Sequence, residues 1–133
     1  MRKLEHVGIA VKSLDEADKL YSRMLGSEPY KHELVPSEGV VTSFYKVGEV
    51  KLELLEANTD KSAIAKFIEK KGEGLHHIAF EVEDIISEAD RLRAEGFEVL
   101  YDEPRKGADN KLVNFVHPKS AGGVLVELCQ ELG

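Results

Sequence analysis

The sequence predicts a single mixed α+β domain built from two βαβββ modules. The first supporting observation is an internal repeat, in which HVGIAVKSLDEADKL from His6 matches HIAFEVEDIISEADRL from His77. The second is that VKLELL and VLVELC recur at matching places downstream, so each half carries the same features in the same order. Such a repeat indicates a duplicated structural unit. The modules are expected at about residues 1–60 and 75–133, joined by a linking helix.

The first module is predicted to contain one strand, one helix and three further strands. His6–Val11 alternates apolar residues with small or polar ones, as in a strand with one buried face. A helix is expected at Ser13–Leu25, with Ser13 as its N-cap and Gly26 as its stop. Its predicted apolar stripe comprises Leu14, Ala17, Leu20, Tyr21 and Met24. The three strands are expected at about Glu28–Leu34, Val40–Val47 and Val50–Glu56.

The second module follows the linking helix, which is expected at about residues 62–71. The strand pattern restarts at His76, and a helix from about Ile85 to Glu95 ends at Gly96. The remaining strands are expected at about Glu98–Tyr101, Leu112–His117 and Val124–Cys129.

The alternation of the strands points to a shared site. Side chains of neighbouring strand residues point to opposite faces, so the leucines on either side of Glu53 point away from it. Glu127 is flanked in the same way by Val126 and Leu128. The apolar neighbours are expected to pack on helices, which places each glutamate on the strand face that also carries a histidine. Pairing of the two modules would gather His6, Glu53, His77 and Glu127.

Two imidazoles and two carboxylates suit Zn²⁺, Co²⁺, Ni²⁺, Mn²⁺ or Fe²⁺, with positions left open for substrate oxygens. Each residue also has a simpler explanation, because a single histidine is more often a hydrogen-bonded structural residue than a ligand. Water on the exposed face of an edge strand would likewise satisfy either glutamate. The repetition favours a metal site, but the residues alone leave both interpretations open.

Composition excludes several other functions. The formal net charge of −7 argues against a nucleic-acid partner, which normally meets a basic stripe. No long apolar run or signal peptide is visible, so neither a membrane span nor export is expected, and a cytoplasmic protein is predicted. The single cysteine, Cys129, excludes an intrachain disulfide and is predicted to be buried.

A resemblance to a known family extends over nearly the whole chain, and its most specific pieces are three longer motifs: HVGIAVKSLDEADKLY, KLELLEANTDKSAIAKFIEKKGEGLHHIAFEV and LYDEPRKGADNKLVNFVHPKSAGGVLVELCQ. They resemble the glyoxalase-like (vicinal oxygen chelate) superfamily and, within it, the methylmalonyl-CoA epimerase family. The resemblance implies paired modules whose eight strands form a partly open cup, and a homodimer. It also implies one divalent metal ion per chain, whether Co, Zn, Ni, Mn or Mg. The implied ligands are His6, Glu53, His77 and Glu127.

The activity implied by the resemblance is that of an isomerase. It would interconvert the (R) and (S) forms of methylmalonyl-CoA by α-proton abstraction and reprotonation through a metal-stabilised enolate. Glu127 is the first candidate base. Some bacterial epimerases carry a second Glu in a GVxE motif, but the matching GVVT places Thr42 there, and a threonine cannot act as a base at neutral pH. Glu53, in the mirror-image position to Glu127, is therefore expected to be the opposing base.

The acyl-CoA substrate of such an enzyme needs contacts at both ends. Ser120 and Gly122 could offer hydrogen-bond donors near the substrate carboxylate. The candidates for the nucleotide phosphates are Arg105, Lys106, Lys111 and Lys119, although solvated loop charges are the simpler interpretation of these four.

Two other functions fit the same scaffold. A glyoxalase I-type lactoylglutathione lyase also uses two His and two Glu, but there the last motif usually reads DPDG instead of HPKS. A non-catalytic bleomycin-resistance-like binding protein keeps the cup and loses the ligands, whereas this chain retains both His and both Glu.

Overall fold

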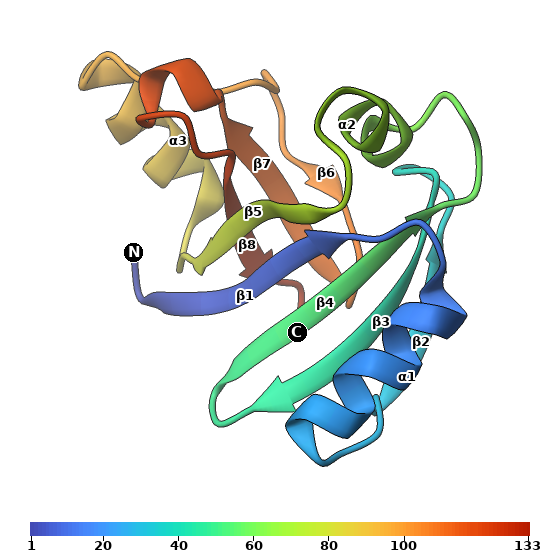
Figure 1. Cartoon of the computed structure of the whole chain (residues 1–133). Helices are drawn as coiled ribbons and strands as arrows, with labels where there is room; N and C mark the ends of the chain where they lie inside the picture. Colours follow the sequence, from blue (N-terminus) through green and yellow to red (C-terminus); the bar gives the residue numbers. More distant parts are fainter. The chain divides into compact units, whose positions relative to one another are not determined.

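The computed structural model describes residues 1–133. In chain order the elements are β1 (Lys3–Ala10), α1 (Leu14–Leu25), β2 (Lys31–Val35), β3 (Val40–Val47), β4 (Val50–Ala57), α2 (Ala63–Lys71), β5 (Gly74–Glu81), α3 (Ile85–Ala94), β6 (Arg105–Lys106), β7 (Lys111–Val116) and β8 (Val126–Glu131). The strands form one eight-stranded sheet in the order β2-β3-β4-β1-β5-β8-β7-β6 (Figure 1). None of the helices is both long enough and apolar enough to cross a membrane.

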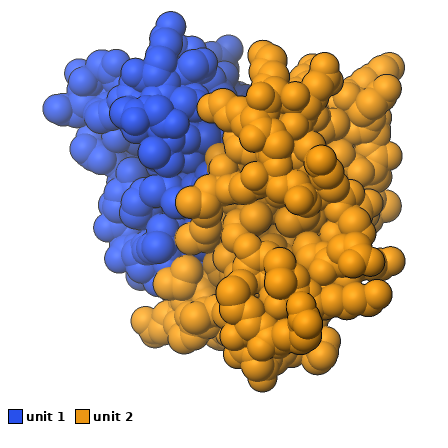
Figure 2. Space-filling model, in the orientation of Figure 1, with its two compact units in different colours: residues 1–6, 77–133 blue, residues 7–76 orange.

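The chain divides into two compact units, which Figure 2 shows in different colours. Unit 1 comprises residues 1–6 and 77–133, and unit 2 comprises residues 7–76. The division falls inside β1 and β5, so each of these strands contributes residues to both units. The origin of the two halves by duplication stays a prediction.

Unit 2 contains an antiparallel meander of β2, β3 and β4, with α1 packed on β3 and β4 (Figure 1). Alternation along the strands turns one set of side chains towards this helix. Tyr45 and Leu54, both fully buried, pack there with Leu14 and Ala17. The burial of these apolar side chains holds α1 on the sheet and leaves the other strand face for polar residues such as Glu53.

Helix α1 begins and ends where the sequence predicts. The Ser13 hydroxyl accepts a hydrogen bond from the Glu16 N–H at 3.2 Å, and Gly26 follows the helix with a φ of 73°. The prediction of the apolar stripe is wrong for Leu20 and Met24, which are 51% and 63% exposed. Each residue turns the helix by about 100°, which carries these two side chains past the edge of the buried face.

A polar residue, Asp18, occupies part of that buried face. Its carboxylate accepts hydrogen bonds from the Ser43 hydroxyl at 2.6 Å and the Tyr45 hydroxyl at 2.8 Å, and His32 Nε2 lies 2.8 Å away. Burial by itself raises the pKa of Asp18, but the bonds to His32, Ser43 and Tyr45 more than offset this effect and hold the pKa below 3.8. The network therefore ties α1 to β2 and β3 through an ionised carboxylate.

In unit 1, β8 lies between β5 and β7, parallel to the first and antiparallel to the second. Helix α3 packs on β7 and β8 (Figure 1). Asp84 is its N-cap, and the Asp84 carboxylate accepts hydrogen bonds from the N–H groups of Ile86 and Ser87. The core beneath it includes Ile85 and the fully buried Leu128. This packing fixes which face of β8 is turned away from the helix.

The strand predicted at Glu98–Tyr101 does not form. Only an isolated bridge joins Val99 to Val116. The Asn114 side chain explains the difference, because its amide oxygen accepts from the Tyr101 N–H and its amide nitrogen donates to the Tyr101 carbonyl, both at 3.0 Å. A side chain thus satisfies backbone groups that a regular ladder would use. The short strand β6 pairs with β7 instead, and the sequence did not predict it.

Candidate metal centre

Three neighbouring strands of the sheet each contribute one side chain to a buried cluster in unit 1. His6 comes from β1, His77 from β5 and Glu127 from β8. The residues on either side of Glu127 pack in the core with α3, so alternation directs its carboxylate to the opposite face. Ala79 stands beside Glu127 in the β5–β8 register and packs with Val113 and Cys129.

The three ligand atoms form a tight triangle. His6 Nε2 and His77 Nε2 are 3.0 Å apart, and Glu127 Oε1 lies 3.0 Å from His77 Nε2 and 3.4 Å from His6 Nε2. With bonds of about 2.1 Å, two ligands of one metal ion lie about 3.0 Å apart at right angles and about 3.4 Å apart at tetrahedral angles. The spacing of the triangle therefore fits a single divalent ion, and the donor set suits the ions predicted from the sequence.

Burial and charge favour an ionised carboxylate in this cluster. His6, His77 and Glu127 are 4%, 7% and 7% exposed. Burial by itself raises the pKa of Glu127, but the charge and hydrogen bond of His6, with the contacts of His77, lower it far below its ordinary value. A carboxylate must lose its proton to bind a metal, and here the neighbouring imidazoles already favour that state.

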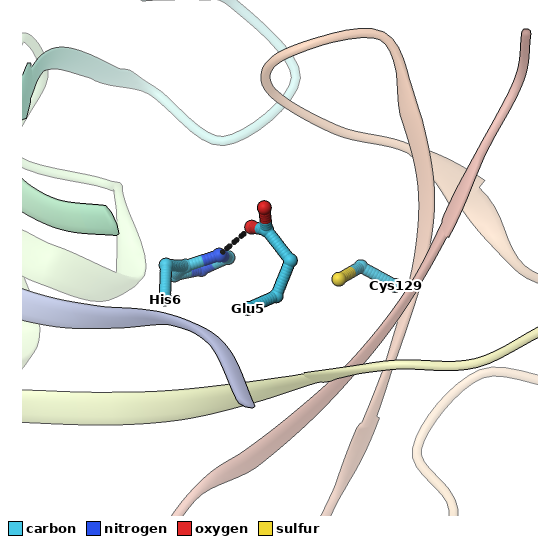
Figure 3. Close-up of side chains that lie close together, drawn as sticks. All are labelled: Glu5, His6 and Cys129. Carbon is cyan, nitrogen blue, oxygen red and sulfur yellow. Dashed lines mark hydrogen bonds and ion pairs between the residues drawn. The ribbon is translucent and has the colours of Figure 1, made fainter. Parts of the chain in front are cut away.

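Sequence reasoning missed Glu5, the residue that precedes His6. It is 3% exposed, and its Oε1 lies 2.7 Å from His6 Nδ1 (Figure 3). Figure 3 also shows Cys129, which is fully buried as predicted, with its sulfur directed towards Glu5. Ligand atoms of Glu5, His6 and Cys129 all lie within 4.8 Å of one another. The available signal was a carboxylate inside the apolar run LEHVGIAV.

The predicted fourth ligand, Glu53, lies on β4 in unit 2 and is 4% exposed. Its neighbours Leu52 and Leu54 pack with α1, so Glu53 faces away from that helix, as alternation predicts. Thr42 faces the same way on β3; it is fully buried, and its hydroxyl has no hydrogen-bond partner. The roles of Glu53 as a ligand and base stay predictions.

The cationic residues considered for phosphate binding have different environments. Arg105 and Lys106 form the exposed strand β6, and the Arg105 guanidinium lies 3.8 Å from the centre of the Tyr101 ring. Lys119 is exposed, with its Nζ 3.6 Å from a carboxylate oxygen of Glu98. Lys111 does not fit the phosphate role, because it is only 3% exposed and forms ion pairs inside unit 1.

Ser120 and Gly122 lie beside a short 3-10 turn at Pro118–Ser120. The Ser120 hydroxyl accepts a hydrogen bond from the Glu98 N–H at 3.1 Å and donates to the His117 carbonyl at 3.2 Å. Gly122 has a φ of 67°, which favours glycine at this position. Contact of either residue with a substrate stays a prediction.

A protein-family model described as the Glyoxalase/Bleomycin resistance protein/Dioxygenase superfamily matches residues 5–115. The chain belongs to this superfamily. The variant Streptomyces coelicolor methylmalonyl-CoA epimerase solved with 2-nitronate-propionyl-CoA is 37% identical, with a TM-score of 0.95 covering 100% of this chain and 99% of that one. The predicted glyoxalase-type fold class is thereby confirmed.

Two curated relatives match this superfamily member over nearly its whole length. The "Ethylmalonyl-CoA/methylmalonyl-CoA epimerase" of Cereibacter sphaeroides is 44% identical over 96% of this chain and 97% of that protein. The "Uncharacterized protein YqjC" of Bacillus subtilis is 40% identical over 100% of this chain and 95% of that protein. The chain is thus related to methylmalonyl-CoA epimerases, and its buried His and Glu cluster is consistent with a metal site.

Proposed function

We propose that this chain is a metal-dependent epimerase that interconverts the (R) and (S) forms of methylmalonyl-CoA. The observation that carries the proposal is the buried triangle of His6, His77 and Glu127, found in a chain that is 44% identical to a named epimerase. In this proposal the three residues, together with Glu53, hold one divalent ion. Such an ion would supply positive charge to the thioester and carboxylate oxygens of the substrate.

The reaction exchanges one hydrogen at the carbon between the thioester and the carboxylate. Both carbonyl groups withdraw charge from that carbon, so a positioned carboxylate can remove its proton. We assign this step on one face to Glu127 and on the opposite face to Glu53. One carboxylate takes the proton and the other returns one, so the configuration inverts while the composition of the substrate is unchanged. Both groups are nearly inaccessible to water, which strengthens electrostatic interactions with a substrate.

Arg105, Lys106 and Lys119 are proposed to meet the phosphates of the CoA group, and Ser120 and Gly122 to meet the substrate carboxylate. The first two are exposed on β6 in the same unit as the triangle. Replacing both Arg105 and Lys106 with Gln should raise KM and leave kcat unchanged, because such contacts bind substrate and transition state equally. A fall in kcat at unchanged KM would contradict this assignment.

The deciding experiment incubates the Co²⁺-loaded protein with one epimer of methylmalonyl-CoA in heavy water. We expect deuterium to enter at the α-carbon while the stereochemical purity is lost, measured by mass spectrometry and a stereospecific coupled assay. Ethylmalonyl-CoA is a second substrate to test, because the Cereibacter sphaeroides relative is named for both. If neither deuterium nor inversion appears with Co, Zn, Ni, Mn or Mg, the chain is not this epimerase.

Single variants separate the two bases. Glu53→Gln should retain deuterium exchange from one epimer but lose inversion, because only the face served by Glu127 remains active. Glu127→Gln should abolish inversion, and isothermal titration with Co²⁺ then shows whether the ion is lost as well. Glu56→Gln is a matched control on the same strand, because the Glu56 carboxylate faces α1, where it accepts a hydrogen bond from the Leu14 N–H at 2.6 Å. Inversion at the normal rate in Glu53→Gln would remove Glu53 from the mechanism.

The proposed assembly is a homodimer. Size-exclusion chromatography with light scattering should give twice the mass of 14.8 kDa, and a monomer that retains full activity would contradict this prediction.

A further inference from the structure

A second set of buried charged residues in unit 1 adjoins His6 of the metal triangle. Glu5 and Lys111 are each only 3% exposed. Buried charges are unfavourable unless they are paired, and these two approach each other, with Lys111 Nζ 3.9 Å from Glu5 Oε2. Lys111 Nζ also contacts Glu131 Oε1 at 3.2 Å and Asp109 Oδ2 at 4.0 Å. The lysine is therefore surrounded by carboxylates, and that of Glu5 also contacts His6 of the metal triangle.

The other oxygen of Glu5, Oε1, lies 2.7 Å from Nδ1 of His6. Figure 3 marks this contact with a dashed line. A carboxylate can only accept this hydrogen bond, so Nδ1 carries the proton. When the ring is neutral, Nε2 on its opposite side keeps its lone pair, and it faces His77 Nε2 and Glu127 Oε1. One contact thus selects the tautomer that can bind a metal and also fixes the rotation of the ring.

We propose that Glu5 is a positioning residue of the metal centre and that Lys111 anchors it. Glu5 holds the Nδ1–H of His6, and the buried ammonium holds the second oxygen of Glu5. The inference rests on the metal centre of the proposed function but not on its substrate. It also assigns a role to Glu5, which sequence analysis missed, and to Lys111, which does not fit phosphate binding.

A competing arrangement would make Glu5 itself a ligand, in the group of Glu5, His6 and Cys129. Two contacts argue against it. His6 Nδ1, the ring nitrogen on the side of Glu5, already hydrogen-bonds to that carboxylate, and the Cys129 thiol donates a hydrogen bond to the Phe80 carbonyl at 3.5 Å. Co²⁺ distinguishes the two arrangements, because a thiolate ligand gives a sulfur-to-cobalt charge-transfer band in the near ultraviolet.

The test measures the Kd of Co²⁺ for the metal-free protein by isothermal titration. Glu5→Gln keeps the size of the side chain and removes its charge, and we expect the Kd to rise about 10- to 100-fold. Glu131→Gln is the matched control, since it removes a different carboxylate from Lys111 and leaves Glu5 in place. Its Kd should stay within about twofold of wild type, because Glu131 is 66% exposed and such pairs are weak.

A purely structural role for Glu5 would lower the melting temperature of the metal-free protein without changing the Kd. The double variant Glu5→Gln/Lys111→Met guards against misfolding, because it does not leave the lysine without its buried partner. Weak Co²⁺ binding in this folded variant would support the proposal. In the wild-type Zn²⁺ form, the Nδ1–H proton of His6 should give a strongly downfield NMR signal that moves upfield in Glu5→Gln.

The outcomes separate the two proposals. Weakened Co²⁺ binding in Glu5→Gln would support the role of Glu5 even if the wild-type protein epimerises neither acyl-CoA. A Kd in Glu5→Gln within about twofold of wild type, or a thiolate band in wild-type Co²⁺ protein, would overturn the positioning role. If wild-type protein binds none of the tested metals, both the positioning role and the metal centre fail.

Discussion

The hydroxyl of Thr42 offers a test of buried polar groups in this fold. Thr42 lies on β3 and is fully buried, yet its Oγ1 has no hydrogen-bond partner. Thr42→Val replaces the hydroxyl with a methyl group of similar size and keeps the β-branched shape that strands favour. The substitution should therefore stabilise the protein, whereas most substitutions at fully buried positions destabilise it.

The expected gain follows from two effects. A buried hydroxyl without a partner is unfavourable by about 1–3 kcal/mol, and burying one more methyl group contributes about 0.8 kcal/mol. Some of this is lost in fitting the methyl group into a closed space, which leaves a gain of about 2 kcal/mol. For a chain of this length that corresponds to a rise in Tm of about 6–10 °C.

The assay is urea unfolding and calorimetry of Thr42→Val beside Ser43→Ala. Ser43 is the next residue and is also fully buried, but its hydroxyl donates to Asp18 at 2.6 Å. Removing that bond to a carboxylate should destabilise the protein by about 1.5–3 kcal/mol. Two adjacent hydroxyl deletions should thus have opposite signs. Equal destabilisation by both variants would refute the reasoning and show that the Thr42 hydroxyl is satisfied.

Three further predictions concern stability. The native pKa of Asp18 lies below 3.8, so its ionised carboxylate contributes to the free energy of unfolding in full above that pH and loses this contribution as the pH falls through the native pKa. In urea unfolding, Asp18→Asn should therefore be less stable than wild type at neutral pH, and the two should converge in stronger acid. Co²⁺ at about 100 times its Kd should raise the free energy of unfolding by about 2.7 kcal/mol, seen as a higher Tm that EDTA reverses. An equal shift of Tm in His77→Ala would contradict the assignment of His77 as a ligand. In thermal melts, Gly39→Ala should lower the Tm more than Gly48→Ala. Both glycines have φ above 60°, but only the Cβ added at Gly39 would meet another side chain, with Thr59 Cγ2 at 2.8 Å. Similar losses of Tm in the two variants would show that Thr59 moves aside.

Local signals in the sequence predicted most of the elements correctly. Ser13 and Gly26 bound α1 because capping and left-handed geometry depend on neighbouring residues alone. The orientation of Glu127 also followed from local alternation, since its apolar neighbours had to face a helix. Local signals could not predict that His6, His77 and Glu127 lie close together, because this depends on the order of strands in the sheet. Only the repeat and the family resemblance pointed to it.

The errors arose where a side chain replaced an expected backbone or packing pattern. Asn114 binds both backbone groups of Tyr101, which no pattern within residues 98–101 could indicate. Lys111 looked like a loop charge because two of its carboxylate partners, Glu5 and Glu131, lie in other strands. Glu5 was missed because adjacent strand residues normally point to opposite faces, so a bond from its carboxylate to His6 was not expected.

The division inside β1 has a consequence for how the chain folds. Residues 1–6 belong with residues 77–133, although the 70 residues between them form the other compact unit. During synthesis, His6 leaves the ribosome early and cannot meet His77, 71 residues later, until the second half of the chain has followed. The loop that this contact closes is long, so its formation is slow compared with that of the local meander of unit 2. The metal centre is thus expected to be a late marker of folding, and a bound ion reports that the first and last strands of unit 1 have met.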